Sequence, residues 1–227
     1  MGRRVSWAQN PVDIALFSRT TIVILVFALA AGLGLLVAQK YFADPSTRPP
    51  QTQAITLFPQ PRALPPFSLQ QSDGTQLVPG ELQGHWTVVF IGFTFCPDVC
   101  PTTLAELGQA QRQWEDLPDA VRPRVLFVSV DPERDTPERV GEYAAAFHRD
   151  TLAATADIPA LEAFTRSLSL VFMKVPGPEG AAANQYTIDH SAAMAVLDPQ
   201  ARMAGVISPP FDPAAIAADL RLLTESR

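Results

Sequence analysis

Cysteine is scarce in this sequence. The only two among 227 residues are Cys96 and Cys100, in the stretch GFTFCPDVCPTTL, so chemistry that needs a thiol is confined to one place in the chain. Neither lies near the N-terminus, which excludes a lipid attached there through a cysteine. Charged residues make up only 18% of the sequence and hydrophobic residues 47%, a composition that excludes a disordered tail and is typical of a protein with a core.

Basic residues are also in short supply. There are 17 Lys and Arg residues against 23 Asp and Glu residues, and the acidic excess lies after the first forty positions. An acidic domain repels the phosphate backbone, so we expect no nucleic acid among the partners of this protein.

One segment, residues 20–38, has neither charge nor proline. A helix of this length crosses roughly 30 Å of hydrocarbon, which predicts a transmembrane helix. A cleaved signal peptide is the alternative, but its apolar core is usually about 7–15 residues, shorter than this segment. Arginines before the segment favour a cytoplasmic N-terminus, residues 1–19. The prediction is a single-pass protein of the inner membrane with its domain on the periplasmic side, or the intermembrane side in a mitochondrion.

Proline is frequent after this segment. Residues 39–63 are predicted to be a proline-rich linker that holds residues 64–227, the predicted globular domain, away from the bilayer. Within the domain, strand patterns alternate with helix patterns before a closing strand pair and helix, which indicates an α/β fold with strands between helices. The expected strands are 86–93, 124–130, 170–175, 192–197 and 203–208, with a hairpin at 72–75, and the expected helices are 102–114, 135–148, 159–169 and 213–223.

The two cysteines lie where a predicted buried strand ends and a helix begins, the position at which α/β sheets place ligands. Pro101 suits the first turn of a helix, so we expect Cys100 at the N-cap, where the helix dipole favours a thiolate. Residues four apart on a helix have Cβ atoms about 5–6 Å apart, wider than the about 3.5–4.5 Å of a disulfide. The spacing favours a metal held by two thiolates and leaves thiol–disulfide exchange open.

A metal site needs a further donor, and three histidines are available. His85 and His148 are expected to be surface residues rather than ligands. His190, in YTIDHS, ends a loop rich in glycine and proline and is a candidate ligand, with a capped or solvated histidine as the alternative. Two thiolates and one imidazole form a soft site that suits Cu(I) and tolerates Cu(II) with an added weak ligand.

Other polar or sulfur-containing residues have a structural interpretation beside a functional one. Met173, Met194 and Met203 could offer thioether ligands to copper, but they lie in apolar runs and are predicted to pack in the core. Asp135 and Glu138 fit a capping box at a helix start, and a role beside the cysteines is the alternative for this stretch.

Three stretches, GFTFCPDVCPTTL, VSVDPERDTPERV and YTIDHSAAMAVLDPQ, taken in this order, resemble the SCO/SenC family of membrane-anchored copper chaperones. The resemblance implies a thioredoxin-like domain that binds one copper ion, as Cu(I) and/or Cu(II), through Cys96, Cys100 and His190. It also implies a role in assembling the dinuclear copper centre of cytochrome c oxidase subunit II. A copper donor protein and a thiol reductant protein are the further partners expected.

Two functions of different class remain open. In the first, the protein is a copper carrier and not an enzyme. In the second, it is a membrane-anchored thiol–disulfide oxidoreductase that keeps the cysteines of a partner reduced. A peroxidase on the same fold is a weaker third option. Because thiol exchange does not need an imidazole, the contribution of His190 distinguishes the first two.

Overall fold

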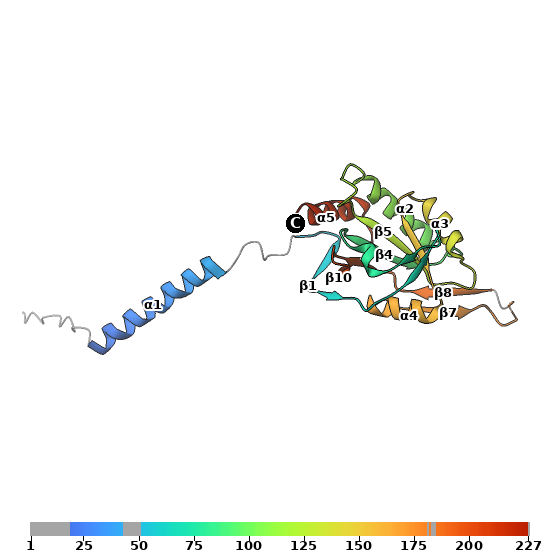
Figure 1. Ribbon diagram of the computed structural model, residues 1–227. Coiled ribbons are helices and arrows are strands. Elements are labelled where there is room, and N and C mark those ends of the chain that lie inside the picture. Colours follow the sequence, from blue (N-terminus) through green and yellow to red (C-terminus); the bar gives the residue numbers. More distant parts are fainter. Residues whose placement is uncertain (1–18, 43–50, 181, 183–184, 227) are drawn as a thin grey trace, which may run out of the picture. The chain divides into compact units, whose positions relative to one another are not determined.

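A computed structural model describes residues 19–42, 51–180, 182 and 185–226. The chain divides into two compact units, residues 1–48 and Pro49–Arg227. Figure 1 shows an isolated helix in the first unit and a layered domain in the second. The predictions for residues 1–18, and for the part of the linker at residues 43–50, lie outside the described residues.

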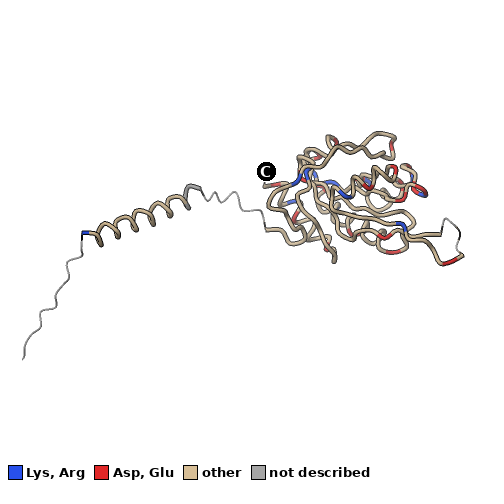
Figure 2. The backbone as a smooth tube through the Cα atoms, turned by 90° about the horizontal axis from the view of Figure 1, so that it is seen from below, with Lys and Arg blue, Asp and Glu red and all other residues tan. Residues whose placement is uncertain are grey.

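The isolated helix is α1 (Arg19–Phe42). Its segment Arg19–Ala38 has a mean hydropathy of 2.7 and is long and apolar enough to cross a membrane. Large apolar side chains along it are exposed, such as Phe27 at 73%. Figure 2 shows that the charged residues of the described chain gather on the domain, whereas α1 is almost free of them. The predicted helix at residues 20–38 therefore exists, with the length and polarity expected.

The domain is built on one sheet of eight strands in the order β1-β10-β9-β4-β5-β6-β2-β3. The strands are β1 (Ile55–Ala63), β2 (Leu69–Gln71), β3 (Gln76–Leu77), β4 (Thr87–Gly92), β5 (Arg124–Ser129), β6 (Leu152–Thr155), β9 (Met194–Leu197) and β10 (Arg202–Ile207). β4 runs parallel to β5, and β5 to β6, whereas β9 runs antiparallel to β4. The carboxyl ends of β4 and β5 therefore share one edge, where α/β sheets place ligands.

Helices cover both faces of this sheet. They are α2 (Val99–Arg112), α3 (Pro137–Ala145), α4 (Ile158–Ser167) and α5 (Pro213–Glu225), with a short 3-10 helix, η2 (Pro79–Leu82). Figure 1 shows α2 and α5 on one side of the central strands and α4 on the other. Every residue of β4 is buried, as its continuous apolar pattern predicts. The predicted α/β architecture and its Asp-Gly hairpin are confirmed.

A second, two-stranded sheet consists of β7 (Phe172–Pro176) and β8 (Tyr186–His190). The strands are antiparallel, and Phe172 is the partner of His190 in the register. Since β7 and β8 pair only with each other, part of this hairpin faces solvent. Met173 is 63% exposed, so its predicted place in the core is wrong, whereas Met194 and Met203 are fully buried as predicted.

The predicted linker extends too far into the folded domain. Residues 55–63 form β1, which pairs antiparallel with β10 at the edge of the main sheet. Pro59 and Pro61 are tolerated there because an edge strand has N–H groups without a ladder partner, and the register shifts between Leu57 and Arg62. Ile55 is only 3% exposed. The folded domain therefore includes this strand and begins before residue 64.

Candidate metal-binding and thiol site

The cysteine loop follows directly from the central strand β4. The last residue of β4 is Gly92, and a Cβ atom there would lie 2.9 Å from Cys100 Sγ and 3.0 Å from Phe127 Cε2. These distances are too short for a side chain, so glycine is required by the close approach of Cys100. The sulfur of Cys100 is thereby packed against the end of the strand, and the residue has no exposed surface.

Helix α2 begins at Val99, one residue before Cys100. Its N-cap is Asp98, so the prediction of Cys100 as the N-cap is wrong. The N–H group of Cys100 lies 3.3 Å from Cys96 Sγ. A helix start leaves such N–H groups without helical partners and carries a partial positive charge. The sulfur that receives this interaction is therefore that of Cys96, which is partly exposed.

The two thiols have different environments. Both are free, with Cys96 partly exposed and Cys100 buried. Burial raises the pKa of the Cys100 thiol far above its ordinary value, although the backbone N–H of Phe93 acts in the opposite direction. Burial therefore opposes the thiolate that the helix start was expected to favour at Cys100. A metal ion that binds this sulfur has to displace a proton.

His190 reaches the cysteines from the end of β8. Its Nε2 atom lies 3.5 Å from Cys100 Sγ, and its Nδ1 atom lies 3.1 Å from the carbonyl oxygen of Ser191. Because a carbonyl only accepts, Nδ1 carries the proton and the Nε2 lone pair faces the sulfur. Burial lowers the pKa of the imidazole, which keeps the ring in the neutral form that binds metals.

Two contacts join these residues: the backbone N–H of Cys100 meets Cys96 Sγ, and Cys100 Sγ meets His190 Nε2. Within the described ranges, no group of three or more Cys, His, Asp or Glu side chains is already arranged as a metal site. A three-donor site at this place therefore requires a side-chain shift when the ion binds. The rings of Phe90 and Phe93 lie edge-on to His190, with centroids 6.1 and 6.3 Å away, and surround the imidazole with apolar surface.

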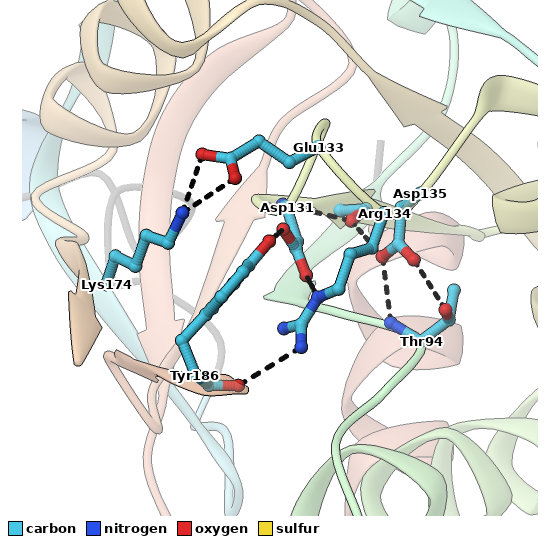
Figure 3. A network of polar contacts seen from close by, with 8 residues as sticks. Thr94, Asp131, Glu133, Arg134, Asp135, Lys174 and Tyr186 are labelled. Atoms are coloured by element: carbon cyan, nitrogen blue, oxygen red, sulfur yellow. Dashed lines mark hydrogen bonds and ion pairs between the residues drawn. The ribbon is translucent and has the colours of Figure 1, made fainter. Parts of the chain in front are cut away.

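A stack of aromatic and basic side chains lies beside the cysteine loop. Asp131 accepts hydrogen bonds from the Tyr186 hydroxyl at 2.6 Å and from Arg134 Nε at 2.5 Å, as Figure 3 shows. The Arg134 guanidinium lies 3.7 Å from the Tyr186 ring centroid and 4.9 Å from that of Phe95. The stack connects the start of β8 to the residue before Cys96. Phe95 is 49% exposed and remains accessible beside the site.

Asp135 does not have the capping role expected from the sequence. The N-cap of α3 is Thr136, whose side chain accepts the N–H of Arg139. The carboxylate of Asp135 instead binds Thr94 in the cysteine loop, at 2.9 Å from its backbone nitrogen. The capping-box interpretation is wrong by one residue, and the alternative that places this stretch beside the cysteines agrees with the contact.

The prediction that His85 and His148 lie on the surface is wrong, since each is only 7% exposed. His85 Nδ1 lies 2.9 Å from the carbonyl oxygen of Arg122, and His148 Nε2 lies 3.0 Å from Glu115 Oε1. Each of these contacts joins residues more than thirty positions apart in the chain. The histidine that contacts Cys100 Sγ is His190, and not His85 or His148.

Residues 58–225 match the model of the SCO1/SenC family. The chain belongs to this family. SCO1 homolog 1, mitochondrial, of Arabidopsis thaliana is 35% identical over 135 residues, 60% of this chain and 39% of that protein. SCO2 homolog, mitochondrial, of Bos taurus is 35% identical over 133 residues, 59% of this chain and 49% of that protein. The chain thus spans less than half the length of these two SCO relatives.

The fold of the SCO1/SenC domain agrees with solved structures. Bradyrhizobium japonicum ScoI with copper bound has a TM-score of 0.62 and 33% identity, covering 71% of this chain and 99% of that one. The predicted fold, a thioredoxin-like α/β domain with one N-terminal apolar helix, is confirmed.

Gly92 escaped the sequence analysis, and Asp135 was placed beside the cysteines only as the alternative to a capping role. Gly92 precedes the loop in GFTFCP, where a glycine at a strand end signals a close approach. Asp135 comes after the end of β5, which runs parallel to β4, the strand that precedes the cysteine loop. Its place after a neighbouring parallel strand is the signal that favoured a role beside the cysteines.

Proposed function

We propose that this protein is a copper metallochaperone that binds one copper ion through Cys96, Cys100 and His190. The observation that carries the proposal is the 3.5 Å approach of His190 Nε2 to Cys100 Sγ between residues ninety positions apart in the chain. Membership of the SCO1/SenC family and the copper found in a relative support it. Thiolate and neutral imidazole are donors that suit copper in either oxidation state.

The chemistry of the carrier is ligand exchange and not turnover. Copper is the cargo, and it displaces at least the proton of Cys100 on entry. Delivery requires that the ligands of a partner replace these three donors one after another. Cys96, the more exposed sulfur, is the first donor that an incoming ligand can reach.

The proposed recipient is cytochrome c oxidase subunit II, during assembly of its dinuclear copper centre. A donor protein would supply the copper, and a thiol reductant protein would keep both sulfurs reduced, since copper loading needs free thiols. The apolar segment of α1 would hold the protein in the inner membrane as a single-pass anchor, with the domain on the periplasmic side.

A copper titration of the reduced full-length protein in detergent tests the proposal. Wild type is expected to retain one copper ion per chain and to show a thiolate-to-copper charge-transfer band with Cu(II). The His190→Ala variant is expected to lose affinity by at least about a hundredfold, the upper end of what loss of an outer-shell partner costs. His148→Gln, which alters another buried imidazole, is the matched control and should bind as wild type does.

A thiol–disulfide oxidoreductase is the second candidate. The difference in exposure between Cys96 and Cys100 favours it, because an exposed sulfur can attack a disulfide while a buried one resolves the mixed intermediate. His190→Ala should then leave most of the exchange rate with a dithiol substrate. Absence of retained copper in wild type, together with exchange that survives this substitution, would replace the first candidate by the second.

A further inference from the structure

We infer that Asp135 is the positioning residue of the site: its hydrogen bonds to Thr94 fix the loop that carries Cys96, and through it the affinity for copper. The inference rests on the proposed function for its copper readout. Its effect on the loop rests on the geometry alone.

The carboxylate of Asp135 is 1% exposed and receives three short hydrogen bonds. The Thr94 backbone N–H donates to Oδ2 at 2.9 Å, and the Thr94 hydroxyl to Oδ1 at 2.5 Å. The Ser129 hydroxyl contacts Oδ2 at 2.5 Å. Figure 3 shows both oxygens of Asp135 occupied from the side of the loop and of β5.

These bonds have a defined direction. The Ser129 oxygen accepts the N–H of Asp131 at 3.2 Å, so its own proton is available for Asp135. The neighbouring guanidinium of Arg134 pairs with Asp131 and not with Asp135. Among the described residues no ion pair involves Asp135, so hydrogen bonds alone compensate the burial of this carboxylate.

Besides this anchor, the loop is held by ring contacts, of Phe93 with His190 and of Phe95 with Arg134. Strand β4 ends at Gly92 and α2 begins at Val99, so residues 93–97 belong to neither element. Within the loop the Cys96 N–H reaches the Phe93 carbonyl at 3.3 Å. The Thr94 contacts join this turn to the end of β5. Loss of an outer-shell partner of this kind typically costs 10–100-fold in metal affinity.

Substitution by asparagine separates geometry from charge. An amide oxygen at the Oδ2 position can still accept from the Thr94 N–H and from Ser129. The amide NH2 group at the Oδ1 position can donate to the Thr94 hydroxyl, which then accepts. Asp135→Asn therefore keeps all three bonds and removes the charge, whereas Asp135→Ala removes both.

The experiment measures Cu(I) affinity by competition in the full-length reduced protein, together with the charge-transfer spectrum of the Cu(II) form. Asp135→Ala is expected to bind at least about tenfold more weakly and to shift the band. Asp135→Asn should lie between wild type and alanine, closer to wild type. The control is Asp219→Ala, which removes another buried carboxylate that accepts backbone N–H groups, near β1, and should leave affinity and spectrum as in wild type.

A metal-free measurement keeps this inference distinguishable from the proposed function. Amide hydrogen exchange at Thr94 and Cys96 should accelerate at least about tenfold in Asp135→Ala and not in Asp219→Ala. If wild type binds no copper while this acceleration occurs, the proposed function fails and the loop anchor stands. Unchanged exchange at Thr94 and Cys96 overturns the inference, as does an asparagine variant that binds copper as weakly as alanine.

Discussion

Gly92 shows how one missing side chain makes room for a candidate metal ligand, the sulfur of Cys100. A methyl group at this residue would meet Cys100 Sγ at 2.9 Å and the ring of Phe127 at 3.0 Å. Both neighbours are fully buried, so neither has free space to move into. The sulfur can stand against the end of β4 only because the position is glycine.

We therefore predict that Gly92→Ala displaces the Cys100 side chain and lowers both the unfolding free energy and the copper affinity. Overpacking in a core typically costs about 1–3 kcal/mol of unfolding free energy, measurable by denaturant titration. Copper affinity should fall as well, because the displaced sulfur faces His190 at a different distance. Gly80→Ala is the control, since a Cβ atom there meets nothing within 4 Å. Equal stability and affinity in Gly92→Ala and wild type would contradict the prediction.

At the scale of residues, the sequence predicts candidate metal ligands more readily than the environment of each side chain. Cys96, Cys100 and His190 stand out by type and motif, and the structure brings Cys100 and His190 together. Two features at Cys100 were not foreseen: the helix begins before it, and burial raises the pKa of its thiol. The role of Asp135 depends on which strand lies beside β4, which local sequence patterns do not contain.

At the scale of elements, β1 is the clearest case of a strand held by one distant side chain. The Asp219 carboxylate, on α5, accepts hydrogen bonds from the N–H groups of Gln53, Ala54 and Ile55 at 2.7–2.9 Å. Asp219 is 2% exposed. These contacts fix the residues that enter β1, close to the described start of the domain.

Asp219→Ala is expected to release this entry segment. Buried N–H groups left without a partner cost about 1–3 kcal/mol each when water cannot replace the acceptor, so unfolding free energy should fall. Hydrogen exchange should accelerate at residues 53–57. Asp212→Ala, which removes the N-cap of the same helix, is the control and should leave exchange in β1 unchanged. Protection of residues 53–57 that survives Asp219→Ala would argue against this clamp.

Elements with strong local patterns were predictable, and elements defined by their partners were not. The continuous apolar run of β4 and the Asp-Pro start of α5 gave nearly correct bounds. Residues 55–63 contain two prolines and alternate poorly, so they read as linker. Their strand conformation comes from pairing with β10, about 150 positions away in the case of Ile55 and Ile207. Pairing between positions so far apart in the chain produces no pattern in the local sequence.

At the scale of the whole molecule, the two units allow a direct test of the anchor. Full-length protein is expected to sediment with membranes and to resist extraction by high salt, because the apolar segment at Arg19–Ala38 partitions into hydrocarbon. A chain that starts at Pro49 should stay in the supernatant and keep the copper stoichiometry of wild type, since the domain is compact by itself.

The substitution Leu29→Arg gives a second, less drastic version of this test. A charge at the centre of the segment costs about 2.5–3.5 kcal/mol on insertion scales, so the membrane fraction should decrease. Protein that pellets equally well without residues 1–48 would mean that something other than α1 attaches it.

The division of the domain into a main sheet and a separate hairpin has one more consequence. Cys100 lies on α2 and Cys96 in the loop between β4 and α2, whereas His190 ends β8 in the two-stranded ribbon of β7 and β8. An ion held by all three donors would bridge two substructures that share no strand ladder. Copper binding would then act as a crosslink that stiffens the ribbon, and copper release would let the ribbon move independently of the main sheet.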